Sequence, residues 1–221
     1  MIVSKQKPLA EILEALNGKE RVFIAGCSEC ATICHVGGEK EVAEMKEILE
    51  KQGKEITGTI ILEPACHKPM DRKLLRNADG LENADCVLVL ACGSGAQTVA
   101  EVLDKEVVTG VNSYFVGQIQ NLRTFEERCR LCGECLLNYT GGLCPIALCP
   151  KHILNGPCGG AQNGKCEVDR EKECVWHLIY ERLKKRGKLH LLRKIWPAKD
   201  WSLDTTARKR IVLGMGDEER E

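Results

Sequence analysis

The chain has 221 residues, with 43% hydrophobic and 4% aromatic residues, and its 32 basic and 32 acidic residues leave no formal net charge. This length suits one ordinary domain with a smaller module, and the balanced charge gives no general argument for nucleic acid or an anionic membrane as a partner. Without a secretory signal or the roughly 18 uninterrupted apolar residues that a membrane helix requires, we expect a cytoplasmic protein with no membrane span.

Short apolar runs alternate with helical patterns between about residues 20 and 117. The runs predict strands at residues 21–26, 58–64 and 86–93 and a shorter fourth strand at 106–112. The helical patterns predict helices at 37–53, around 72–77 and at 94–104. Such an alternation is typical of a Rossmann-like parallel α/β sheet with right-handed connections.

The pattern changes near residue 121, where cysteine, glycine and proline begin to dominate. A segment of this composition has little apolar surface to bury, and bound metal can supply the missing stabilisation. A helical pattern returns at 175–194 and is followed by a polar tail with two tryptophans. We therefore predict an α/β domain at 1–120, a cysteine-rich iron–sulfur domain at 121–174, and a helix with a partner-docking tail at 175–221.

The chain contains 14 cysteines. In a reducing cytosol, clustered cysteines are more often metal ligands or redox centres than disulfides. Disulfides remain an alternative for a protein from a hyperthermophile, but a Cys-x-x-Cys pair bridges poorly and ligates metal readily.

Five of these cysteines follow predicted strands. Cys27, Cys30 and Cys34 come directly after the first strand, Cys66 follows the second, and Cys92 ends the third. In a parallel sheet these positions meet at the carboxyl edge, where open α/β sheets bind ligands. A close triplet of thiolates with one from elsewhere is a common way to hold a [4Fe-4S] cluster. Cys66 and Cys92 compete for the fourth place, and we favour Cys92 because the helix that starts there would stabilise an anionic cluster.

The same triplet also permits zinc, with Cys66 or His67 as the fourth ligand. A redox-active dithiol is the least favoured alternative, because the spacing makes a ligand triplet rather than a pair. Cys86 begins a buried strand at the other edge of the sheet, and we interpret it as a core residue.

Eight further cysteines lie in the second half. Their opening C-x2-C-x2-C spacing is the start of a bacterial ferredoxin run, although the fourth cysteine is delayed. Eight thiols match two four-iron clusters, but the count does not give the partition, and one cluster with one zinc ion is an alternative. The whole chain would thus hold two or three [4Fe-4S] clusters, with zinc as an alternative at one site. The eight are Cys129, Cys132, Cys135, Cys144, Cys149, Cys158, Cys166 and Cys174.

Four stretches carry a resemblance to a known family. They are GCSECATICHVGGEKEVAEM, VLVLACGSGAQTVAE, CRLCGECLLNYTGGLCPIALCPKHILNGPCGG and GKCEVDREKECVWHLIYERL. Together they resemble the methylenetetrahydrofolate reductase C-terminal-domain family, in particular its small accessory subunits. The resemblance covers about residues 21–183 and implies iron–sulfur clusters at the matching cysteines, Cys27, Cys30, Cys34, Cys92 and those from Cys129 to Cys174.

The resemblance also implies partners. The family's small subunit accompanies an FMN-containing TIM-barrel subunit that reduces 5,10-methylenetetrahydrofolate to 5-methyltetrahydrofolate in the reductive acetyl-CoA pathway. This chain is too short for a barrel of about 250 residues, so flavin and folate would sit mainly on the other subunit. We expect a non-catalytic electron-transfer subunit that receives electrons from ferredoxin or another donor protein.

The rival interpretation is a metal-stapled scaffold. Its clusters or zinc would only stabilise the fold of the chain and hold the flavoprotein in place. No His–carboxylate pair stands out among the five histidines, so proton chemistry is not indicated. Trp196 and Trp201, in the tail, suit anchoring on a partner protein, and core packing is an equally good interpretation of both.

Overall fold

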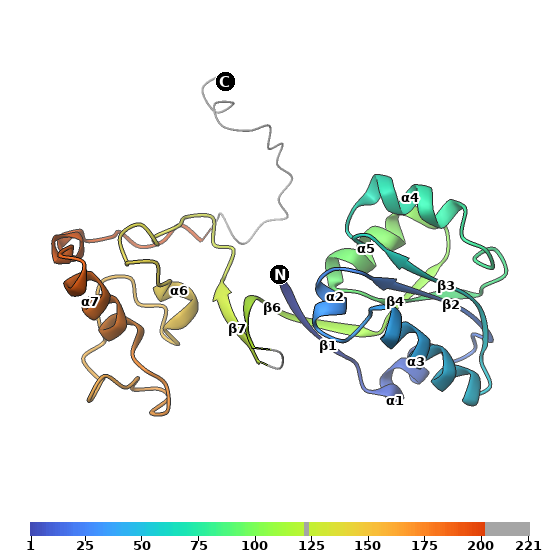
Figure 1. Ribbon diagram of the computed structural model, residues 1–221, viewed down its shortest axis with the longest axis horizontal. Coiled ribbons are helices and arrows are strands. Elements are labelled where there is room, and N and C mark those ends of the chain that lie inside the picture. The colour runs from blue at the N-terminus through green and yellow to red at the C-terminus, as the bar shows by residue number, and fades with distance from the viewer. Residues whose placement is uncertain (122–123, 202–221) are drawn as a thin grey trace, which may run out of the picture. The chain divides into compact units, whose positions relative to one another are not determined.

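The chain folds into two compact units. The computed structural model describes residues 1–121 and 124–201 (Figure 1). The first unit runs from Met1 to Glu127, and the second begins at Arg128.

A parallel sheet forms the centre of the first unit. Its strands are β2 (Arg21–Cys27), β3 (Glu55–Leu62), β4 (Cys86–Leu90) and β5 (Glu106–Thr109), in the order β3-β2-β4-β5. All neighbouring pairs are parallel, which confirms the predicted four-stranded α/β sheet. The chain adds β3 on one side of β2 and then β4 on the other, so the strand order reverses between β2 and β4. Ligands of such sheets bind at this reversal, at the carboxyl ends of the strands.

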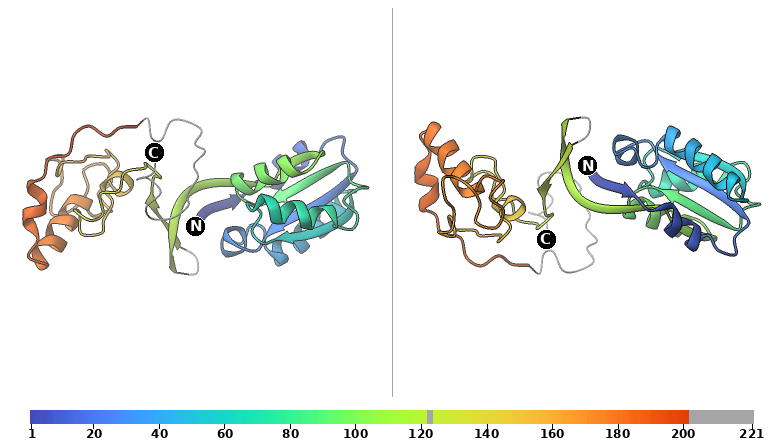
Figure 2. Two further views of the ribbon diagram at one scale, coloured as in Figure 1. Left: turned by 90° about the horizontal axis from the view of Figure 1, so that it is seen from above. Right: turned by 90° about the horizontal axis from the view of Figure 1, so that it is seen from below.

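Helices cover both faces of this sheet. Figure 1 shows α4 (Lys68–Arg76) and α5 (Gly93–Val102) on one face and α1 (Leu9–Ala15) and α3 (Glu39–Lys51) on the other, and the two views in Figure 2 agree. The start of α3 is set by Glu41, whose carboxylate accepts the Gly38 N–H at 2.9 Å. Strand residues between the helix layers, such as Phe23, Ile24 and Leu88, are fully buried.

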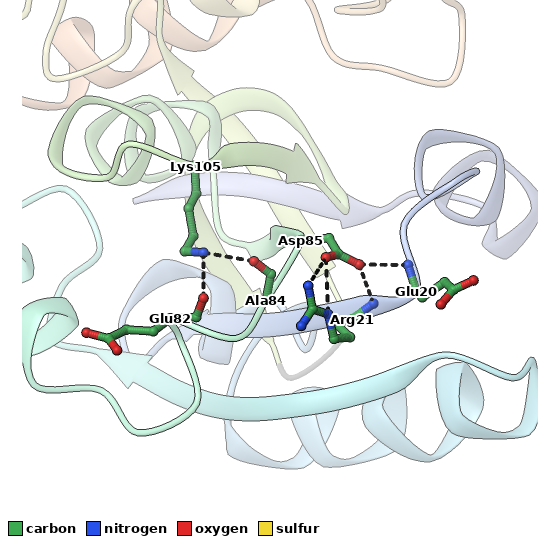
Figure 3. Close-up of polar contacts among 6 residues, drawn as sticks. All are labelled: Glu20, Arg21, Glu82, Ala84, Asp85 and Lys105. Atoms are coloured by element: carbon green, nitrogen blue, oxygen red, sulfur yellow. Dashed lines mark hydrogen bonds and ion pairs between the residues drawn. The ribbon is translucent and has the colours of Figure 1, made fainter.

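Polar contacts fix the amino-terminal edge of the sheet, opposite the end where ligands are expected (Figure 3). The carboxylate of Asp85, just before β4, accepts a bond from the Arg21 guanidinium at 2.7 Å and another from the Arg21 backbone N–H at 2.8 Å. The Lys105 ammonium donates to the carbonyl oxygens of Glu82 and Ala84 at 3.0 and 2.8 Å. These bonds hold the starts of β2 and β4 in register.

The first unit also contains an antiparallel sheet that we did not predict. Its strands are β1 (Ile2–Gln6), β6 (Val111–Asn121) and β7 (Thr124–Cys129), in the order β1-β6-β7. The predicted strand at 106–112 is wrong at its end, because β5 stops at Thr109 and Val111 already belongs to β6. The change of sheet occurs at Gly110, where an added β-carbon would lie 2.5 Å from the Leu90 side chain.

The second unit has little regular structure. It contains α6 (Pro145–Leu148), α7 (Val175–Lys185) and a 3-10 helix, η1 (Leu189–Arg193). The predicted helix at 175–194 is too long, because Gly187 takes a φ of 65° and the Lys188 N–H turns back to the Leu183 carbonyl oxygen at 2.9 Å. Such a closure is a common helix end. The buried apolar cluster is small: Leu143, Cys174, Val175, Trp176, Ile179 and Leu183.

Two further predictions concern the tail and the membrane. Trp201 is the last residue described, so the tail predicted beyond it, residues 202–221, lies outside the described part of the chain. No helix in the described part of the chain is long and apolar enough to cross a membrane.

Candidate functional site

The thiol triplet lies at the carboxyl end of β2, beside the reversal in strand order. Cys27 is the last residue of β2 and is 7% exposed, Cys30 begins the short helix α2 (Cys30–Ile33), and Cys34 ends it. The Thr32 hydroxyl donates to the Cys27 carbonyl oxygen at 2.8 Å, and the Cys27 N–H donates to the Gly37 carbonyl oxygen, also at 2.8 Å. These bonds fold the loop back on the strand, so the triplet is held in one tight turn.

The structure places Cys92 and Cys66 on neighbouring segments at the same edge of the sheet. Cys92 is the N-cap residue of α5, and Cys66 is exposed in the loop between β3 and α4. A β-carbon added to Gly95, in the first turn of α5, would lie 3.0 Å from the side chain of Ala65. The two chain segments therefore pack closely, with Cys66 next to Ala65 and Cys92 three residues before Gly95.

Electrostatics show that these thiols are near one another. Burial raises the pKa of the Cys66 thiol, and the thiols of Cys92, Cys27 and Cys30 raise it further. Burial also raises the pKa of Cys34, and Cys30 and Cys92 add to that effect. Thiols in such a set repel one another as thiolates, and a bound cation or cluster removes this penalty because a coordinating thiol is deprotonated outright. The donor chemistry of the set is that of a thiolate-bound metal group, but the described residues do not arrange three of these thiols around a single metal ion.

A second set of thiols occupies the start of the second unit. Cys129, Cys132 and Cys135 lie on either side of Gly133, whose φ is 79°, and Cys144 is the N-cap residue of α6. Burial raises the pKa of Cys144, the amides of Ala147 and Ile146 oppose that effect, and the thiols of Cys132 and Cys129 add to it. The delayed fourth cysteine of the ferredoxin-like run is thus near the first members of that run.

The remaining four thiols form a third set around one small cavity in the second unit. The lining includes Cys149, Cys158, Cys166 and Cys174. Two acidic residues, Glu167 and Glu173, also line this cavity, and Glu167 accepts hydrogen bonds from the Cys158 thiol at 3.0 Å and from the Lys151 ammonium at 2.6 Å. These four thiols therefore share one cavity, which the other four do not line.

All 14 cysteines are free thiols in the structure. Within residues 1–121 and 124–201, no group of three or more His, Cys, Asp or Glu side chains is arranged to hold a single metal ion. Cys86 lies at the amino-terminal end of β4, away from the thiol set, and is fully buried, which raises its pKa to about 11. That position agrees with its interpretation as a core residue.

The helix that follows the Cys66 loop contains a buried acid that was missed in the sequence. Asp71, on α4, is fully buried, and neither of its carboxylate oxygens has a hydrogen-bond partner among the described residues. Burial raises its pKa to about 6, against a smaller opposing effect of His67. The sequence did offer one indication of this burial. Asp71 lies four residues before the buried Leu75, and residues four apart share a helix face.

Comparison with known proteins relates part of the chain to one family. Residues 108–202 match the family model described as "Methylene-tetrahydrofolate reductase C terminal". The matched segment contains all eight thiols of the second and third sets, whereas the first set lies outside it. No curated protein and no solved structure matches the chain. The match supports the relationship to the methylenetetrahydrofolate reductase family that the sequence motifs indicated.

Proposed function

We propose that this chain is an iron–sulfur electron-transfer subunit of a methylenetetrahydrofolate reductase complex, comparable to accessory subunits of the MetV type. The observation that carries the proposal is the coincidence of two features in one segment. Residues 108–202 match the reductase C-terminal family, and the same segment contains eight cysteines, four of which line one cavity.

Each set of four would hold one cluster. Cys129, Cys132, Cys135 and Cys144 form one proposed ligand set, and Cys149, Cys158, Cys166 and Cys174 form another. Cys27, Cys30, Cys34 and Cys92 form the third, with Cys66 as the competing ligand and zinc as the alternative metal. When bound, iron–sulfur clusters supply one-electron transfer at potentials that their surroundings tune. The chain itself would supply the thiolates and place backbone amides near them, as the amides of Ala147 and Ile146 are placed near Cys144.

The proposed partner carries the flavin and the folate. The described parallel sheet has four strands, whereas a TIM barrel closes eight. The chain would then accept electrons from ferredoxin or another donor protein and pass them to the FMN of the partner subunit. The flavin would in turn reduce 5,10-methylenetetrahydrofolate to 5-methyltetrahydrofolate.

A metal-stapled scaffold is the second candidate, and the small core of the second unit favours it. Among the described residues of this unit, six form the buried apolar cluster. Such a core stabilises a domain weakly, and small modules are commonly stabilised further by a bound metal. The same thiols would then hold the flavoprotein in place without carrying electrons.

Anaerobic purification of the complex tests the proposal. The chain is co-produced with its flavoprotein, and iron, sulfide, zinc and flavin are quantified together. Electron transfer predicts about eight or about twelve iron atoms per chain, for two or three four-iron clusters. It also predicts that a reduced donor protein reduces the flavin in the complex much faster than in the isolated flavoprotein.

Two results would support the scaffold instead. One is zinc without iron. The other is an iron-containing complex in which the flavin is reduced no faster than in the flavoprotein alone.

A further inference from the structure

An apolar cavity of the second unit has no role in the proposed electron transfer. It has a volume of about 480 Å³ and lies between α7, the loop around Asn155 and the chain from Leu191 to Trp196. This volume lies in the range of small-molecule sites, which bury most of their ligand. The cavity shares Cys174 and Trp176 with the neighbouring cavity lined by four thiols.

Aromatic rings form much of its wall. They belong to Tyr139, Trp176, Tyr180 and Trp196. The rings of Tyr139 and Trp196 meet edge to face, with their centroids 4.9 Å apart and their planes at 74°. Flat walls of this kind suit a flat ligand ring, which can pair with them in stacked or edge-to-face geometry.

Hydrogen bonds hold the ring of Trp176 and the backbone of Trp196 in place before any ligand arrives. The Trp176 indole N–H donates to the Ile153 carbonyl oxygen at 2.9 Å. The Asn155 side chain both donates to the Trp196 carbonyl oxygen and accepts the Trp196 N–H, each at 2.8 Å. A wall ordered in this way loses little conformational entropy on binding.

The cavity wall also contains basic residues. In the described part of the chain, the lining contains Lys194 and His177 and no acidic residue. The Lys194 ammonium lies 4.0 Å from the ring centroid of Trp196 and 4.4 Å from that of Tyr139. The ring faces thus hold this cation at the cavity wall, where it can pair with a negative group of a ligand.

We propose that this cavity binds a small molecule with a flat aromatic ring and a negative charge. The ring packs against Trp176 and Trp196, and the negative group pairs with Lys194. This assignment requires no metal and is independent of electron transfer.

A matched pair of dyes tests both parts of the assignment. The probes are 1-anilinonaphthalene-8-sulfonate and N-phenyl-1-naphthylamine, which share their rings and differ in the sulfonate. They are titrated into the full chain, prepared anaerobically and carrying Trp201→Phe. Trp176 and Trp196 are then the only tryptophans left to transfer excitation energy to a bound dye.

We expect one equivalent of the sulfonate to bind, about tenfold more tightly than the neutral dye. Lys194→Met should remove this preference, whereas Lys185→Met, at an exposed lysine of α7 that does not line the cavity, should retain it. Trp196→Leu should weaken the binding of both dyes to a similar extent. Thermal unfolding of each variant checks that the fold is retained.

Three results would overturn the assignment. Equal affinity of the two dyes would show that the negative charge plays no part in binding. Binding of several equivalents would indicate general adsorption to apolar surface. A preference that persists in Lys194→Met would show that the sulfonate is bound elsewhere.

Discussion

Gly37 lies against the backbone of Leu90, so closely that a β-carbon on it would stand 1.7 Å from the Leu90 carbonyl oxygen. Gly37 follows the thiol triplet, and Leu90 ends the strand that leads to Cys92. A β-carbon on Gly26, directly before Cys27, would likewise stand 2.4 Å from the Gly37 carbonyl oxygen. Contacts between backbones thus bring the triplet to the end of β4, and only glycine permits them.

Gly37→Ala should therefore destabilise the first unit. The clash is with backbone, which cannot rotate away, so we expect a loss of roughly 2 kcal/mol or more in the free energy of unfolding. Gly93→Ala is the matched control, because its β-carbon would meet only the Ser113 hydroxyl, at 3.8 Å. Urea unfolding followed by circular dichroism measures both. Equal stability of Gly37→Ala and wild type would refute the close approach.

The fourth ligand of the first set can be decided by two substitutions. Cys92→Ser should lower the iron and sulfide content by about one cluster, or four iron atoms per chain, and Cys66→Ser should leave it unchanged. The reason is that Cys92 caps α5, whose amide groups favour an anionic group there. Cys86→Ala is the control for loss of a buried thiol at the other end of β4. Loss of iron from Cys66→Ser alone would assign the fourth place to Cys66.

Asp71 should make the stability of the protein fall as the pH rises. The pKa of this carboxyl is about 6 in the folded chain, above its ordinary value, because burial disfavours the charged form. The folded state therefore holds the proton more tightly between about pH 4 and pH 6, and stability is lost as the pH rises through this window. Above it, the buried carboxylate costs roughly 3 kcal/mol.

The measurement is urea unfolding of wild type and Asp71→Asn at several pH values. Asp71→Asn should gain stability relative to wild type as the pH rises from about 4 to about 7. The exposed Asp79→Asn serves as the control and should show no such trend. A constant difference between Asp71→Asn and wild type across the window would contradict a raised pKa.

Asp85 should act in the opposite direction at lower pH. Its hydrogen bonds from Arg21, first from the guanidinium and then from the backbone, lower its pKa to about 2 (Figure 3). The stabilisation is therefore fully present above about pH 4 and is lost as the pH falls toward about pH 2. Asp85→Asn should flatten the acid limb of the stability curve. The effect should be modest, because the pair is partly exposed, and an unchanged acid limb would show that the pair contributes nothing.

The parallel sheet could be predicted because its strands are buried on both faces and form continuous apolar runs. All five residues of β4, for example, are buried. The antiparallel sheet could not, because its longest strand, β6, has one buried residue and pairs with the very start of the chain: Val116 lies opposite Ile2. Pairings over such a separation leave no local periodicity. The end of α7 was missed because the apolar pattern continues through Leu191 and Leu192, beyond the turn at Gly187.

The sequence by itself determined that thiols follow the parallel strands and that eight more are concentrated in a segment with little core. These features reside in spacing and strand polarity, which are local properties of the chain. Only the tertiary structure decided which distant thiols face one another, since Cys149 and Cys174 share a cavity although 25 positions separate them. It also decided the burial of Asp71 and the aromatic cavity around Trp196. Such groupings depend on how loops pack against helices, and that packing is set by contacts between residues far apart in the chain.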